Sequence, residues 1–170
     1  LSNQMKAKGV IEVDGIIADL GVSSHQFDQP ERGFSIRNEA DLDMRMNASS
    51  QSTAADVLNT YDEDDLVRIF RSYGEIKNAR RLAAEIVQQR TDGDIQTTKK
   101  LIDLLSGLAP KFKEHKYYAQ VFQALRIEVN KELEALESFL GQASDLLKPE
   151  KFKPFDTFSK TFICGNKAYD

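Results

Sequence analysis

The chain has 170 residues, of which 41% are hydrophobic and 29% are charged, so it can bury one core of ordinary size or two small ones. This composition argues against a disordered chain, and no apolar run approaches the roughly 20 residues of a membrane-spanning helix. The formal net charge of −4 gives no overall attraction for nucleic acid, so such a partner would need a local basic patch. The single cysteine cannot form an internal disulfide, and the two distant histidines predict no zinc cluster. We therefore expect a cytoplasmic protein without a metal site or a membrane partner.

The first part of the chain predicts a short helix stopped by Gly9 and then an apolar strand from Val10 to Ala18. The apolar residues of this strand are nearly continuous, which is typical of a parallel strand covered on both faces. Asp19 ends the strand, and Ser23 and Ser24 lie in the turn beyond it. Buried parallel strands deliver polar groups to a ligand crevice in this way, so the acid and the turn form the first candidate site. Turn chemistry, with both hydroxyls bonded to the local backbone, is the alternative for the serines.

A long loop and a series of helices follow this strand. Residues 23–50 are rich in Gly, Pro, Asp, Asn and Ser, which predicts an ordered loop, and loops of this length in compact domains are usually functional. Cap residues and apolar spacing then predict several helices. They run from Ser52 or Thr53 to Tyr61, from Asp62 to Tyr73, from Ile76 to Arg90, and from Thr97 or Thr98 to between Gly107 and Pro110.

The longest predicted helix runs from about Tyr117 to Leu147. Its apolar residues alternate in steps of three and four, which is typical of a helix packed along one seam. The seam consists of Phe122, Leu125, Val129, Leu133, Leu136, Leu140, Ala143 and Leu147. We expect the seam to be buried in the core, and a self-associating coiled coil is the alternative. The phenylalanine-rich residues after Pro149 form a tail without an assigned element.

Several blocks of residues, in unbroken order from about residue 10 to 149, resemble those of a known family. They are Asp19-Leu-Gly-Val-Ser-Ser-His-Gln26, Glu31-Arg-Gly-Phe-Ser35, Leu42-Asp-Met-Arg-Met46, Tyr73-Gly-Glu75, Ala79-Arg80, and Phe122-Gln-Ala-Leu-Arg-Ile127 with Val129-Asn130 and Glu132-Leu133. In these blocks the chain resembles the MraW-type S-adenosylmethionine-dependent methyltransferases. That family methylates N4 of a cytidine in small-subunit ribosomal RNA. The resemblance therefore implies a ribosomal RNA processing enzyme with S-adenosylmethionine as cofactor and this RNA as partner.

The resemblance also implies an α/β fold, in which a partial Rossmann-like methyltransferase domain carries an inserted, mostly α-helical domain. The implied division is residues 1–27 in the methyltransferase domain, 28–50 in a loop near the active site, 51–120 in the inserted substrate-recognition domain, and 121–170 in a long helix returning to the methyltransferase domain plus the tail. In the family, the residues matching Asp19 and Gln26 contact the methyl donor. The family's glycine-rich cofactor loop and its acidic ribose-binding residue do not occur among these 170 residues, so we expect only part of the donor site here.

Methyl transfer to an exocyclic amine depends on positioning and on acceptors for the amine protons. Oxygen atoms at the strand end can accept these protons, which makes Ser23 and Ser24 catalytic candidates beside Asp19. Asp43 and Arg45 in the long loop are the other catalytic candidates, because they could line the target pocket. An ion pair that only fixes the loop is the alternative for this second pair.

Two groups of residues are candidates for RNA binding. Arg126 and Asn130 are four residues apart and share one helix face, so they could hold a phosphate or a base edge. Structural hydrogen bonds to a neighbouring loop are the alternative and are the more frequent role of such residues beside a buried helix. Lys111, Lys113 and Lys116, interleaved with aromatic residues, suit phosphate contact and base stacking, and a solvated charged turn is the alternative. The rival function for the whole chain is a noncatalytic helical module that binds RNA or protein. The oligomeric state stays open, a homodimer included.

Overall fold

The computed structural model describes residues 1–21 and 32–148. The chain divides into two compact units. One, which we call the terminal unit, comprises Leu1–Asp19 and Ala135–Asp170; the other, the helical unit, comprises Leu20–Glu134. The described residues are dominated by helices, and among them β-pairing is limited to two isolated bridges.

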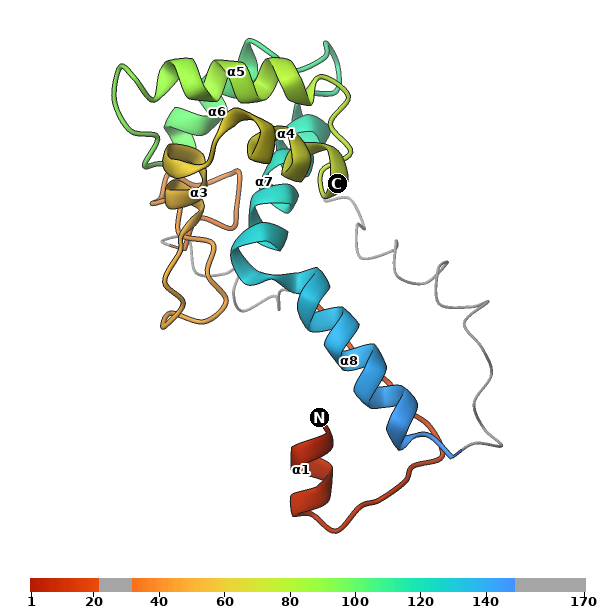
Figure 1. Ribbon diagram of the computed structural model, residues 1–170. Helices are drawn as coiled ribbons and strands as arrows, with labels where there is room; N and C mark the ends of the chain where they lie inside the picture. The colour runs from red at the N-terminus through yellow and green to blue at the C-terminus, as the bar shows by residue number, and fades with distance from the viewer. Residues whose placement is uncertain (22–31, 149–170) are drawn as a thin grey trace. The chain divides into compact units, whose positions relative to one another are not determined.

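The helical unit is built around its longest helix. Its helices are α3 (Ala54–Thr60), α4 (Glu63–Ser72), α5 (Ala79–Gln89), α6 (Thr98–Ser106) and α7 (Glu114–Asn130). Helix α7 contacts α3, α4 and α6, and α4 packs against α5 (Figure 1). The largest wholly buried side chains come from every one of these helices and include Leu58, Phe70, Leu82, Leu101 and Leu125. One hydrophobic core therefore holds the helical unit together.

Local capping explains where three of these helices begin. The Thr53 side chain accepts a hydrogen bond from the Asp56 backbone, and the Asp56 carboxylate accepts one from the Thr53 backbone, which is a complete capping box at α3. Asp62 caps α4 and Thr97 caps α6 through their side-chain oxygens. These starts confirm the sequence predictions. Helix α5 begins only at Ala79, later than expected from the apolar pattern.

The delayed start of α5 follows from the turn before it. Glu75 has a positive φ of 54°, and the Ile76 backbone N–H donates to the carbonyl of Phe70, so the chain folds back on the end of α4. Gly74 allows this turn to lie against α7, because a Cβ there would come within 2.8 Å of the Gln120 carbonyl oxygen. A side chain at this position would push the end of α4 away from α7.

The prediction of one helix from Tyr117 to Leu147 is wrong. Helix α7 ends at Asn130, Lys131 takes a left-handed conformation with φ 49°, and a separate helix, α8 (Glu132–Leu146), follows. The burial of the apolar seam is interrupted at this break, since Val129 is buried whereas Leu133 is 48% exposed. The break is stabilised locally, because the Lys131 ammonium bonds the Glu128 carboxylate, 2.7 Å away. An ion pair three residues apart is compatible with a helix, whereas the left-handed backbone of Lys131 ends α7, and apolar spacing cannot reveal that conformation.

The terminal unit contains α1 (Ser2–Ala7), which ends before Gly9 as expected. The strand predicted over Val10 to Ala18 is not formed, since its pairing is a single parallel bridge between Val13 and Leu147. The expectation that both faces of this segment are covered is also wrong, because Ile11 is 83% exposed and Ile17 is wholly exposed. A parallel strand depends on neighbouring strands for its hydrogen bonds, and the described residues supply one short contact.

Candidate functional site

The segment from Leu42 to Met46 presents alternate residues to two environments. Leu42 and Met44 are each 1% exposed and belong to the core of the helical unit, while Asp43 and Arg45 are partly exposed. The segment is not a regular strand, because Met44 in its middle has a positive φ of 57°. The backbone carbonyls of Leu42 and Asp43 accept hydrogen bonds from the first N–H groups of α3, which anchors the segment to that helix. The apolar residues therefore fix the segment and leave its two charged residues at the surface.

Asp43 and Arg45 form the ion pair that we gave as the alternative to a pocket lining. Arg45 Nε donates to Asp43 Oδ1 over 2.7 Å, and Nη2 donates to Oδ2 over 2.8 Å, so the contact is bidentate. The remaining guanidinium nitrogen, Nη1, donates to the carbonyls of Ala48 and Ser50. The hydrogen bonds from Arg45 lower the pKa of Asp43, although burial opposes them. Asp43 is therefore ionised at neutral pH and is suited to accept hydrogen bonds rather than to donate a proton.

Asn130 joins this loop segment to the end of α7. Its Nδ2 donates to the carbonyl of Met44 over 2.7 Å and to that of Arg126 over 2.9 Å, and its Oδ1 accepts from the Met46 backbone over 2.6 Å. Asn130 thus makes the hydrogen bonds to a neighbouring loop that were the alternative to RNA binding, and backbone groups engage both ends of its amide. From the other side, Arg32 Nη2 donates to the carbonyls of Arg45 and Met46. The segment is clamped between two side chains.

Arg126, the other predicted residue on this face of α7, pairs with Glu132 rather than with the loop. Its Nε donates to Glu132 Oε1 over 2.8 Å, and Nη2 reaches Oε2 at 3.3 Å. Both side chains remain about one-fifth to one-quarter exposed. The pair spans the bend after Asn130, so it fixes the first residue of α8 against the last turns of α7. Exposure leaves Arg126 accessible to a further ligand.

A buried carboxylate, Glu128, lies beside this region and was not singled out from the sequence. It is 4% exposed, and its Oε1 accepts from the Tyr61 hydroxyl over 2.8 Å and from Lys131 Nζ over 2.7 Å. Arg68 Nη2 lies 3.8 Å from the same oxygen. Burial by itself would raise the pKa of Glu128, and the bonds from Lys131 and Tyr61 with the nearby Arg68 charge lower it overall. The sequence signal is an acid three residues after Leu125, on the apolar face of α7.

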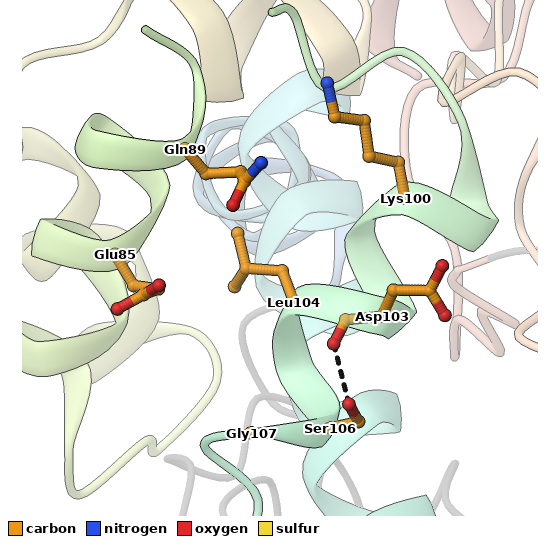
Figure 2. Close-up of a pocket in the computed structure, with 7 residues that line it drawn as sticks. All are labelled: Glu85, Gln89, Lys100, Asp103, Leu104, Ser106 and Gly107. Atoms are coloured by element: carbon orange, nitrogen blue, oxygen red, sulfur yellow. Dashed lines mark hydrogen bonds between the residues drawn. The ribbon is translucent and has the colours of Figure 1, made fainter. Parts of the chain in front are cut away.

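A hollow of about 300 Å³ opens next to Glu128. It is lined by Ser50, Gln51, Ser52, Val57, Tyr61, Glu128, Val129 and Lys131. The Glu128 carboxylate is already paired within the protein, so the arrangement stabilises the junction of α3 and α7. A second, larger hollow of about 410 Å³ lies between α5 and α6 (Figure 2). Its ammonium, Lys100 Nζ, donates to the carbonyls of Gly93 and Asp94.

Lowered carboxyl pKa values make the helical unit sensitive to acid. Asp43 and Glu128 both have pKa values below their ordinary 3.8 and 4.5 in the folded state. Their contribution to stability is therefore complete above those ordinary values and is lost as the pH falls through the folded-state values. We expect the free energy of unfolding, measured in urea from about pH 7 to about pH 3, to fall steadily below about pH 5. Asp43→Asn should make this fall shallower, and an unchanged pH dependence would contradict the role of the ion pair.

The predicted Lys111 and Lys113 lie in the turn before α7 and Lys116 in the first turn of α7, and all three are exposed. Phe112 stands between two of them, is 96% exposed and has a positive φ of 65°. The Phe112 backbone N–H donates to Glu114 Oε1 over 3.0 Å, which holds the turn. These lysines therefore form a surface separate in sequence from the Asp43 and Arg45 segment.

Of the predicted donor-site residues, the structure describes Asp19, which belongs to the terminal unit. Asp19 is exposed, so the prediction that the strand end delivers it to a crevice is not met in the described residues, because the strand itself is absent. Ser23, Ser24 and Gln26 lie outside the described residues. The residues described here do not by themselves enclose a site for a methyl donor. In the same part of the chain no three acidic, histidine or cysteine side chains are grouped to hold a metal ion, and no helix is long and apolar enough to cross a membrane.

Comparison with known proteins identifies the family. Residues 1–152 match the model of the MraW methylase family. The chain belongs to this family. The resemblance found in the motif blocks is thereby confirmed. Membership implies a Rossmann-like methyltransferase fold and a methyl donor, while the described residues show mainly the helical part of such a protein.

Curated relatives share about half of their residues with the chain over the matched region. It is 53% identical over 148 residues to the Ribosomal RNA small subunit methyltransferase H of Cytophaga hutchinsonii, a match that covers 87% of this chain and 50% of the relative. It is 52% identical over 149 residues to the protein of the same name from Bacteroides fragilis, covering 88% and 49%. The relative from Christiangramia forsetii is 48% identical over 149 residues, with the same coverage of 88% and 49%. The chain thus spans about half the length of the curated relatives that it matches.

Proposed function

We propose that the full-length protein of this family member transfers a methyl group from S-adenosylmethionine to N4 of a cytidine in small-subunit ribosomal RNA, in the cytoplasm. The observation that carries the proposal is the family match over residues 1–152, with relatives about half identical whose names state methylation of small-subunit ribosomal RNA. The cytidine and its N4 atom come from the family resemblance of the motif blocks. The chain's own described residues contribute mainly to RNA binding in this proposal.

The proposed division of labour follows the inserted-domain arrangement. Residues 1–27 would belong to the Rossmann-like methyltransferase domain, 28–50 to the loop near the active site and 51–120 to the inserted helical domain, while 121–170 would return to the methyltransferase domain and end in an unassigned tail. The exposed Ile11 and Ile17 support this assignment. Exposed branched apolar side chains within an apolar run indicate a surface that is covered by further residues of the full-length protein or by another protein. The capped helices and shared core support an autonomous role for the helical part.

The clamped loop is the proposed wall of the target site. Asp43, ionised and held by Arg45, is an acceptor fixed in position, and fixed acceptors suit the protons of an exocyclic amine. Ser23 and Ser24 are the further proposed acceptors, from outside the described residues. Arg126 and Asn130 would act at the edge of this wall. Asn130 acts by holding the loop, since its amide is engaged by the backbone, and Arg126 acts through its exposed guanidinium edge.

Asp19 and Gln26 are the proposed contacts to the methyl donor. Asp19→Ala in the full-length protein should weaken the binding of S-adenosylmethionine about tenfold, because one charge-assisted hydrogen bond is lost. Isothermal titration calorimetry measures this, and Asp14→Ala is the matched control. Asp14 is an exposed acid in the same segment, paired with Lys148. Equal donor affinity of the Asp19 variant and the parent would remove Asp19 from the site.

Lys111, Lys113 and Lys116 are the proposed phosphate contacts, in a chain whose net charge of −4 would otherwise repel RNA. Lys111→Glu combined with Lys113→Glu should lower RNA affinity by at least about tenfold and reduce the slope of log affinity against log salt by about one to two. Filter binding at several salt concentrations measures both quantities. Lys99→Glu, at an exposed lysine in the first turn of α6, is the control. An unaltered salt slope in the double variant would assign these lysines to ordinary surface.

A noncatalytic RNA-binding module is the rival function. The compact core of the helical unit favours it, because this unit has its own buried core. Titration of this 170-residue chain with S-adenosylmethionine separates the two for the chain itself. Measurable heat would show a donor site within the chain, whereas RNA binding without donor binding at millimolar concentration would support the module.

A further inference from the structure

Phe112 is the most exposed large apolar side chain of the described helical unit. It is 96% exposed, against 46% for Leu20 and 48% for Leu133 in the same unit. Its φ of 65° lies in the left-handed region, which costs a residue with a side chain free energy. The Glu114 carboxylate accepts from the Phe112 backbone N–H, and the Lys113 backbone N–H donates to the carbonyl of Pro110 over 3.1 Å. The turn therefore holds an aromatic ring in solvent by specific hydrogen bonds.

Positive side chains flank this ring in the sequence. Lys111 and Lys113 flank it, and the acid of the turn, Glu114, is engaged by the Phe112 backbone. The start of α5 adjoins the same turn, because Asn78 Nδ2 donates to the carbonyl of Leu108 over 3.2 Å. Two exposed arginines, Arg80 and Arg81, occupy the first turn of α5.

The position of these arginines is unfavourable for the helix itself. Cations in a first turn oppose the helix dipole, and α5 has neither an acidic residue there nor a side-chain cap. Burial raises the pKa of the Tyr117 hydroxyl in α7, and the Asn78 side chain and then the Arg81 charge partly offset that effect. The hydrogen bond from Asn78 to Leu108 thus connects the arginine-bearing start of α5 to the segment that leads into the lysine turn. Helix stability does not explain this arrangement, whereas attraction of a polyanion does.

We propose that Phe112 is a stacking platform for one unpaired base of the RNA, with the adjoining phosphates held by Lys111, Lys113 and Arg81. This inference rests on the proposed RNA substrate and adds the part of the RNA that the turn recognises. A single ring among cations suits a base between two phosphates, because stacking needs one aromatic face and tolerates any base. A protein partner would require an apolar surround around its anchor, and the neighbours of Phe112 are lysines.

The experiment uses the absence of tryptophan from the chain. In the 170-residue chain, Phe112→Trp makes the only indole, whose fluorescence a stacked base quenches. Phe112→Asn removes the ring, and asparagine tolerates a left-handed backbone, so folding should be kept. Both variants are titrated with a single-stranded RNA of about 10 nucleotides and with the same RNA carrying an abasic site. Thermal unfolding of each variant checks that the fold is intact.

We expect Phe112→Trp to bind the RNA like the parent chain and to be quenched by it, with weaker quenching by the abasic RNA. Phe112→Asn should bind at least about fivefold more weakly with an unchanged salt slope, because a neutral contact is lost. Parent-like affinity of Phe112→Asn, while Lys111→Glu with Lys113→Glu binds weakly, would overturn the stacking role and leave the proposed RNA function standing. Absence of RNA binding by the parent chain would overturn both. Quenching by an apolar peptide but not by RNA would assign the ring to a protein partner.

Discussion

Gly33→Ala should destabilise the helical unit by about 2–5 kcal/mol, since it combines a left-handed backbone with overpacking. Gly33 has a φ of 71°, and a Cβ on it would lie 2.2 Å from the backbone carbonyl oxygen of Asp41. That oxygen belongs to the backbone, so it cannot rotate away as a flexible side chain would. The substitution must displace the backbone between Asp41 and Met44, which carries Asp43 and two buried core residues, Leu42 and Met44.

Urea denaturation followed by circular dichroism measures this loss, with Gly107→Ala as the matched control. Gly107 is the C-cap of α6 with a φ of −76°, and the nearest atom to its added Cβ would be 3.8 Å away. We expect this control to change stability by less than about 1 kcal/mol. Equal stabilities of Gly33→Ala and Gly107→Ala would show that the loop is not held as the structure describes.

Asn130→Ala should cost about 2–4 kcal/mol, because it leaves buried backbone groups without partners. The carbonyl of Met44 loses its donor, and the N–H of Met46 loses its acceptor. Asn130→Asp keeps the acceptor for Met46 and loses the donor to Met44, so we expect an intermediate stability. Chemical denaturation measures all three proteins, and RNA binding is measured in parallel.

Asn47→Ala is the control for this second prediction. Asn47 lies in the same loop and is exposed, and among the contacts described its side chain bonds only to Ser49. We expect a loss of less than about 1 kcal/mol. Loss of RNA affinity in Asn130→Ala at full stability would give Asn130 a direct RNA contact, contrary to the clamp. Undiminished stability and RNA affinity together would leave the clamp without a measurable role.

Sequence predicted the parts of this fold that local chemistry determines. Thr53, Asp62 and Thr97 cap helices through neighbours three residues ahead, so their starts can be read from adjacent residues. The missing strand depends on partners elsewhere in the chain and the break at Lys131 on a left-handed backbone, and apolar spacing carries no information about either. A continuous helix and an interrupted one have the same spacing of apolar residues. Only the backbone at Lys131 and the contacts of Asn130 and Glu128 beside it distinguish them.

Sequence pointed to some residues of this region, such as Asp43, Arg45 and Asn130, but not to their connections. The ion pair of Asp43 and Arg45 was foreseen as an alternative because the two residues are neighbours. The clamp from Asn130 joins groups 84 and 86 positions apart, which no spacing rule connects. Glu128 was overlooked because an acid within an apolar stripe is usually attributed to a solvated edge. The roles of Asp19, Ser23, Ser24 and Gln26 at a donor site stay predictions.

The most direct test of the proposed function is to identify the RNA atom that receives the transferred methyl group. The full-length protein is incubated with S-adenosylmethionine carrying an isotopically labelled methyl group and with unmodified small-subunit ribosomal RNA. The RNA is then digested to nucleosides and analysed by mass spectrometry. The proposal predicts label on N4 of cytidine, and much less in the protein with Lys111→Glu and Lys113→Glu. Label confined to another atom or nucleoside, or no label with a folded protein that binds the RNA, would contradict it.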